Sequence, residues 1–248
     1  MRSSTSCLVP LLVSANLVLC SASIVHAGPI AYSQPPVFPA PFFGWTSDRT
    51  PDNAPKGPEE YQTWDNFIVD RPTLIDGVSW QGFYWDFDDR GKNPVHPDTE
   101  SWEISFWSDA NAQPLASLQV QLLPVADVQS VSAGFAFFQG DTVPVFNFHV
   151  TIPPFLAQAS TMYWLSILSI SPTFNPIWSW MQGTGGNDST FQVNLISGER
   201  HNGLEGDRTF SLEGQTVPEP STLSLLLTGV GCVLGYWWLW RERFVSHR

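Results

Sequence analysis

Short runs of β-branched and aromatic residues, separated by Pro, Gly, Asn and Asp, recur through the middle of this 248-residue chain. In one of them Trp102, Ile104 and Phe106 alternate with more polar residues. A period of two is the pattern of a strand with one buried face. The runs are residues 62–69, 73–85, 101–108, 116–124, 133–139, 143–152, 162–170, 177–182 and 209–213. No helical period interrupts them, so they predict an all-β fold, a single jelly-roll-like β-sandwich.

The first 27 residues have the layout of a secretory signal peptide. Arg2 supplies a positive charge, an apolar stretch follows over residues 8–19, and Val25-His26-Ala27 is a plausible cleavage site. The apolar stretch is too short to span a hydrocarbon layer of about 30 Å. Lipidation at Cys20 is an alternative, but a bulky leucine precedes that cysteine where a lipoprotein motif needs a small residue.

Residues 223–240 form an uncharged run near the other end of the chain. A helix of this length reaches about 27 Å, which is enough to cross a thin bilayer. Arg241 and Arg243 follow at once and predict a cytoplasmic end, because positive residues stay on that side of the membrane. We therefore expect a transmembrane helix over residues 221–240, with the rest of the protein outside the inner membrane.

Pro218, Glu219 and Pro220 stand directly before this apolar run. Prolines hold the backbone extended, which presents the glutamate just outside the bilayer. The three parts of residues 217–248, in this order, resemble the PEP-CTERM sorting signal of Gram-negative bacteria, a tail also named after ice-binding proteins that carry it. The resemblance implies cleavage near Pro218–Pro220 by an exosortase, and a role with exopolysaccharide in the biofilm matrix. A proline-rich linker before an ordinary anchor is the plainer alternative.

Between these ends we expect an extended, proline-rich lead-in over residues 28–58 and the sandwich over residues 59–216. Residues 28–216 contain 21 acidic and 7 basic residues, a formal net charge of −14, and no cysteine. This charge argues against nucleic acid or anionic lipid as a partner and is compatible with cations or neutral glycans. Without cysteine, the domain must be stabilised by hydrophobic burial instead of disulfides.

A second resemblance spans about residues 60–195. The segment from Trp80 to Trp85, and the turn from Trp107 through Asp109 to Pro114, resemble extracellular β-sandwich modules that recur in PEP-CTERM proteins. These are features of a fold, and the resemblance brings no catalytic residues with it.

Asp86, Asp88 and Asp89, followed by a glycine, suggest an oxygen-ligand loop for Ca²⁺. The match to a helix-flanked calcium loop is incomplete, because Arg90 and Pro97 stand where ligands belong. A solvated acidic loop is the alternative interpretation.

Other candidate chemistry is weaker. His96, Asp98 and Glu100 could line one strand face as metal ligands, but no zinc motif is present. Glu103 and Asp109 could be the paired carboxylates of a glycoside hydrolase. The chain has no G-x-S-x-G elbow and no glycine-rich phosphate loop. We therefore expect a protein without catalytic residues.

Tryptophans give the best indication of a ligand. Trp178 and Trp180 lie two residues apart and share a strand face, and Trp107 falls on the polar side of its strand. Exposed aromatic rings stack on sugars, so these three are candidate glycan-stacking residues, with the turn-rich loop 183–190 nearby. The alternative is that the rings fill the core. The sequence thus favours an exported, glycan-associated matrix protein, with an inert structural adhesin or a secreted glycoside hydrolase as alternatives.

Overall fold

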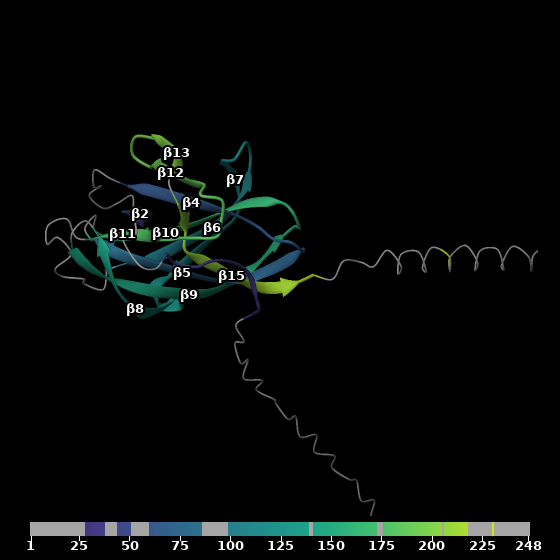
Figure 1. The fold of residues 1–248 in the computed structure, drawn as a ribbon, viewed down its shortest axis with the longest axis horizontal. Helices are drawn as coiled ribbons and strands as arrows, with labels where there is room; N and C mark the ends of the chain where they lie inside the picture. The colour runs from purple at the N-terminus through teal and green to yellow at the C-terminus, as the bar shows by residue number, and fades with distance from the viewer. Residues whose placement is uncertain are drawn as a thin grey trace, which may run out of the picture.

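The computed structural model describes residues 28–37, 44–50, 60–85, 99–138, 141–172, 176–204, 206–217 and 230. The elements in these ranges are fifteen β-strands and one 3-10 turn, Val125–Asp127. The predicted all-β fold is confirmed. Two sheets pack face to face in a sandwich-like arrangement (Figure 1).

The eight-stranded sheet has the order β1-β15-β5-β11-β14, with β2 beside β11 and with β9 and β8 continuing from β5. Its strands are β1 Ile30–Gln34, β2 Gly44–Thr46, β5 Thr73–Trp85, β8 Gln129–Phe138, β9 Asp141–Ala157, β11 Ile177–Gly183, β14 Asp207–Arg208 and β15 Phe210–Thr216.

The seven-stranded sheet has the order β13-β12-β4-β3-β10-β6-β7. Its strands are β3 Asp48–Arg49, β4 Tyr61–Ile68, β6 Ser101–Asp109, β7 Pro114–Pro124, β10 Met162–Ile170, β12 Thr190–Asn194 and β13 Arg200–Leu204. The chain crosses repeatedly between the two sheets, so strands distant in sequence face each other across the core.

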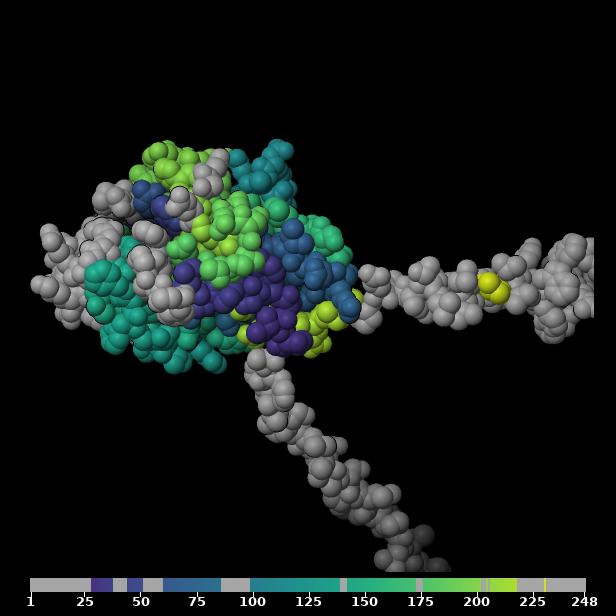
Figure 2. All heavy atoms as spheres, viewed as in Figure 1, coloured from purple at the N-terminus to yellow at the C-terminus, as the bar shows by residue number. Residues whose placement is uncertain are grey.

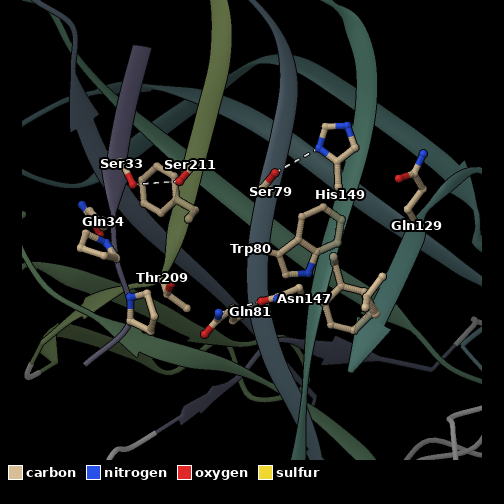
Figure 3. Close-up of a pocket in the computed structure, with 15 residues that line it drawn as sticks. Ser33, Gln34, Ser79, Trp80, Gln81, Gln129, Asn147, His149, Thr209 and Ser211 are labelled. Carbon is tan, nitrogen blue, oxygen red and sulfur yellow. Dashed lines mark hydrogen bonds between the residues drawn. The ribbon is translucent and has the colours of Figure 1, made fainter. Parts of the chain in front are cut away.

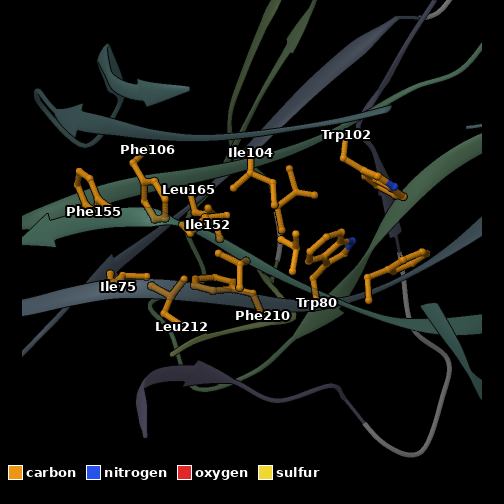
Figure 4. Packing of buried hydrophobic residues seen from close by; sticks show 14 of the residues in the cluster. Ile75, Trp80, Trp102, Ile104, Phe106, Ile152, Phe155, Leu165, Phe210 and Leu212 are labelled. Atoms are coloured by element: carbon orange, nitrogen blue, oxygen red, sulfur yellow. The ribbon is translucent and has the colours of Figure 1, made fainter. Parts of the chain in front are cut away.

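The alternation of side chains along β5 shows how the sandwich forms. Val78 and Trp80 are buried between the sheets, whereas Ser79 and Gln81 are only half-buried on the outer face. The same alternation on the strands of both sheets supplies one continuous core (Figure 4). Hydrophobic burial on this scale accounts for a stable domain without cysteine.

Aromatic rings dominate the middle of that core. Trp102 of β6 meets Trp80, Phe148 and Trp178 of the opposite sheet at ring-centroid distances of 5.3, 5.0 and 5.0 Å. The tilted and edge-to-face geometries are those that aromatic quadrupoles prefer. The two sheets are therefore fixed to each other through large interlocked rings.

The predicted lead-in contributes to both sheets. Its described residues form β1, β2 and β3, and β1 pairs with β15 from Ile30 to Gln34. Figure 2 shows the purple residues of β1 packed beside the rest of the sandwich. Backbone pairing among the described residues thus begins at Ile30, within the segment expected to be a lead-in. The prolines of this segment, Pro29, Pro35 and Pro36, flank β1 and do not lie within it.

The last strand, β15, lies inside its sheet, between β1 and β5. Its pairing with β5 continues to Thr216, and the Val217 amide then donates to the Pro72 carbonyl at 2.7 Å. The ordered backbone thus continues to the residue directly before the Pro-Glu-Pro sequence.

Candidate functional site

A hollow of about 360 Å³ lies on the outer face of the eight-stranded sheet. Strands β1, β15, β5, β9 and β8 run side by side beneath it (Figure 3). Because Trp80 and Phe148 point into the core, their neighbours Ser79, Gln81 and Asn147 face outward and line the hollow. The sheet register sets these side chains opposite one another.

Pairs of polar side chains across neighbouring strands hold each other in place. Ser33 and Ser211 lie with their hydroxyls 2.8 Å apart, and Gln81 Nε2 donates to Asn147 Oδ1 at 2.7 Å (Figure 3). Each hydrogen bond uses one donor and one acceptor of its pair. The Oε1 atom of Gln81 is buried without a hydrogen-bond partner. The lining is therefore preorganised for hydrogen bonding to a ligand.

A serine, a histidine and a glutamate meet at one side of the hollow. Ser79 Oγ lies 3.0 Å from His149 Nδ1 and donates to Glu213 Oε1 at 3.1 Å, and that carboxylate oxygen is also 3.4 Å from His149 Nδ1. In a nucleophilic triad the histidine bridges serine and acid through its two different ring nitrogens. Here both partners share Nδ1, so the geometry does not activate Ser79 as a nucleophile. The cluster instead orients Ser79 and His149.

Apart from one histidine, the lining of the hollow contains no ionisable side chain. None of its fifteen residues is Asp, Glu, Lys or Arg, and amides and hydroxyls predominate. Such a lining contrasts with the formal net charge of −14 carried by residues 28–216. Amide and hydroxyl groups both donate and accept, which suits a neutral, hydroxyl-rich ligand.

Trp178 and Trp180 do not lie at this site or at any surface. Both rings have 0 % exposure in the main core, and Trp180 Nε1 donates to the Thr209 carbonyl at 2.8 Å. The prediction that they share a face is right, but that face is the inner one. The prediction that they stack on a sugar is wrong, because no ligand can reach them.

Trp107 lies on the other outer face of the sandwich, that of the seven-stranded sheet. Its half-buried ring contacts Trp64 edge to face at 5.6 Å, and its Nε1 donates to Ser105 Oγ at 2.9 Å. Trp164 and Phe191 are buried in the same small cluster. One of the three tryptophans predicted to stack therefore reaches the surface, on the face opposite the hollow.

The carboxylates proposed for hydrolysis serve separate structural roles. Glu103 pairs with Arg49 at 3.5 Å, and Asp109 accepts from Trp164 Nε1 at 2.8 Å. Six residues along one strand separate them by about 20 Å, well beyond the spacing of a glycosidase pair. The paired-carboxylate hypothesis is therefore wrong for these residues.

The candidate calcium ligands Asp86, Asp88 and Asp89 lie outside the described residues, as do His96 and Asp98. Within the described ranges no group of three or more His, Cys, Asp or Glu side chains could hold a metal ion.

The loop 183–190 is fixed by a buried aspartate. Asp207 accepts from the backbone amides of Gly186 and Asp188 at 2.8 and 2.7 Å. Behind it, Asp65 accepts from the Arg208 amide. Burial raises the pKa of Asp65 to about 8 and lowers the pKa of Arg208 to about 10. The turn-rich loop is thus held by a polar network within the fold.

A second buried carboxylate, Asp48, occupies another part of the interior. It accepts from the Trp178 amide at 2.8 Å and from Ser171 Oγ at 3.3 Å. Burial raises the pKa of this carboxyl to about 8, and these hydrogen bonds oppose the rise only in part. Both carboxylates are sealed from solvent, so they contribute to structure and to pH-dependent stability.

The residues of the hollow were missed by the sequence interpretation, although part of their signal was present. Asn147 and His149 alternate with Phe146 and Phe148, which predicts an outward polar face on β9. What the sequence does not contain is the register that sets Asn147 against Gln81 of β5.

Comparison with known proteins finds a family match at the C-terminal end of the chain. Residues 216–243 match the family described as the PEP-CTERM protein-sorting motif. No curated protein and no solved structure matches the chain. The match includes Pro218, Glu219, Pro220, Arg241 and Arg243, which lie outside the described residues of the structure.

The chain therefore carries a PEP-CTERM signal, which marks an exported protein that is held at a membrane and sorted by an exosortase. Among the described residues no helix is long and apolar enough to cross a membrane. The helix predicted over residues 221–240 lies outside those residues apart from Val230.

Proposed function

We propose that this protein is a non-catalytic component of the cell envelope or biofilm matrix of a Gram-negative bacterium, and that it binds a neutral glycan in the hollow of the eight-stranded sheet. The observation that carries the proposal is the uncharged lining of amide and hydroxyl side chains. The sorting signal supports it, because export brings this surface into contact with the exopolysaccharide outside the cell.

The chemistry of the lining favours a sugar over other ligands. Sugar hydroxyls both donate and accept hydrogen bonds, as do Gln81, Asn147 and Ser79. An anionic ligand would find no arginine or lysine in the hollow, and the carboxylate beside it, that of Glu213, is already engaged by Ser79 and His149. A shallow open site on a flat sheet fits a segment of a polymer better than an enclosed small molecule.

The route to this location follows from the two ends of the chain. We propose that residues 1–27 act as a signal peptide, that residues 221–240 cross the inner membrane, and that an exosortase cleaves near Pro218–Pro220. The domain then remains in the envelope or in the extracellular matrix. A calcium ion at Asp86, Asp88 and Asp89 remains part of the proposal.

Affinity electrophoresis of the full chain in detergent, through gels containing exopolysaccharide from the producing bacterium, tests the site. We expect the double variant Gln81→Ala/Asn147→Ala to lose at least tenfold in retention, because both hydrogen-bonding amides are removed. Gln158→Ala is the matched control, since this exposed amide lies outside the hollow. Runs with calcium and with a chelator test the acidic loop.

The alternatives give different results in the same experiment. A loss of retention with Trp107→Ala and none with the double variant would move the glycan to the seven-stranded sheet. No retention of the unmodified chain under either calcium condition would contradict glycan binding and favour an inert structural adhesin.

A further inference from the structure

The strand β7 forms an open edge of the seven-stranded sheet. It pairs only with β6 among the described strands, and its eleven residues include no charged side chain. Leu118, Val120 and Leu122 are 51 %, 48 % and 64 % exposed. Soluble proteins usually protect such edges with lysine, proline or an inward charge, because unpaired backbone groups recruit other strands. Here prolines stand only at the two ends of the strand.

The sequence of β7 is self-complementary. Residues Leu118-Gln119-Val120-Gln121-Leu122 read the same in both directions. In an antiparallel pair of identical strands related by a two-fold axis, residue i faces j and j faces i. A two-fold axis at Val120 therefore sets Leu118 against the Leu122 position of the other copy and Gln119 against Gln121. An unrelated partner would place no such demand on the sequence.

We infer that β7 pairs with β7 of a second copy of this chain, in antiparallel register centred on Val120. The pairing joins the two seven-stranded sheets into one and sets the apolar stripes of Leu118, Val120 and Leu122 from the two copies side by side on one face. The amides of Gln119 and Gln121 form the opposite row.

The net charge of the domain and a hydrogen bond that holds β7 in place both support a second copy of this chain as the partner. Two exported segments that each carry −14 repel each other over most of their surfaces, so an uncharged edge is where they approach at least cost. The edge is held to its own domain, because Gln119 Nε2 donates to the Pro153 carbonyl at 2.8 Å. A β-bulge at Leu118, the first residue of the self-complementary segment, shifts the β6–β7 register, and the pairing from Gln119 to Leu123 is regular.

Cysteine cross-linking of the full chain in detergent tests the register. With Cys7, Cys20 and Cys232 replaced by serine, we expect Val120→Cys to form disulfide-linked dimers, because directly opposed side chains lie about 5 Å apart. Leu118→Cys and Leu122→Cys should each fail alone, since four residues along a strand separate the two thiols by about 13 Å. A mixture of these two variants should cross-link.

A second measurement does not depend on disulfide geometry. Val120→Lys places two like charges opposite each other across the two-fold axis. We expect the dissociation constant of the dimer to rise at least tenfold, which light scattering would detect as a shift in mass from dimer towards monomer. Ile196→Lys is the control, because this side chain is 50 % exposed but lies outside β7. Dimers from Phe137→Cys but not from Val120→Cys would assign the contact to β8 and overturn the proposal. An unchanged mass with Val120→Lys would also overturn it.

Discussion

The two faces of β5 differ in what they do for the molecule. On the inner face, Val78 and Trp80 are sealed between the sheets and contribute to the stability of the fold. On the outer face, Ser79 and Gln81 line the hollow, where they hydrogen-bond to His149, Glu213 and Asn147. Between residues 78 and 81 the alternation of side chains therefore separates core contacts from the lining of the hollow. We expect substitutions on the inner face to lower the free energy of unfolding, and substitutions on the outer face to lower retention in exopolysaccharide gels.

The largest effect is expected at the aromatic core. Trp102→Ala removes a ring that is 1 % exposed and contacts three other rings, so we expect a loss of about 3–5 kcal/mol in the free energy of unfolding. Urea unfolding followed by circular dichroism measures it. Ile196→Ala, at a half-exposed position, should change the same free energy by well under 1 kcal/mol. Equal effects would contradict the assignment of Trp102 to the core.

The buried carboxylate Asp48 should make stability depend on pH. Its pKa is raised to about 8 in the folded state, so between pH 4 and 8 the folded chain keeps a proton that the unfolded chain loses. Stability then falls as the pH rises, by up to about 1.4 kcal/mol per pH unit for this group.

Urea unfolding at pH 5 and pH 7 measures this dependence. Asp48→Asn cannot titrate, so the difference between the two pH values should shrink in the variant. Asp65 keeps a dependence of the same sign, which is why the difference should not vanish. An unchanged difference would show that Asp48 does not bind the extra proton.

Gly82 tests the inner face of β5 by overpacking. A Cβ atom at this position would lie 2.5 Å from Trp178 Nε1, closer than non-bonded atoms approach. We therefore expect Gly82→Ala to destabilise the fold by about 1–3 kcal/mol, measured by thermal unfolding. At Gly134, where nothing lies within 4 Å of an added Cβ, alanine should cause no clash, although the φ of +107° there adds backbone strain.

The smallest change in stability is expected on the outer face. Ser211→Ala removes one hydroxyl of the exposed Ser33–Ser211 pair and should cost no more than about 1 kcal/mol in urea unfolding. Retention in exopolysaccharide gels should nevertheless fall, because the hollow loses a donor. If Ser211→Ala lowered the free energy of unfolding and left retention unchanged, Ser211 would contribute to the fold and not to the proposed site.

Much of this fold was predictable because alternation is a local property. The predicted runs 73–85 and 162–170 coincide with β5 and β10, and 101–108 differs from β6 by one residue. The strands β1, β2 and β3 were not predicted, since proline-rich segments read as extended lead-in and their pairing depends on distant partners. The local alternation of side chains predicts the strands with a strong pattern. Segments with a weak pattern form strands only where tertiary contacts supply a pairing partner.

The candidate site was less predictable for the same reason. Alternation shows that Trp178 and Trp180 share a face, but it cannot show which face is covered by the second sheet. The hollow needs the register of β5, β9 and β15, whose residues lie as far apart in sequence as Gln81 and Ser211. The sorting signal needs no such register, because it is a continuous stretch of sequence.

The position of β15 also sets the order of events during export. This strand lies between β1 and β5, so the eight-stranded sheet cannot close until residues 210–216 have crossed the membrane. The matched family begins at residue 216, the last residue of this strand. A domain that has failed to complete its sheet would still carry β15 as a loose segment beside the sorting enzyme, and a completed one would present only the short stretch after Val217.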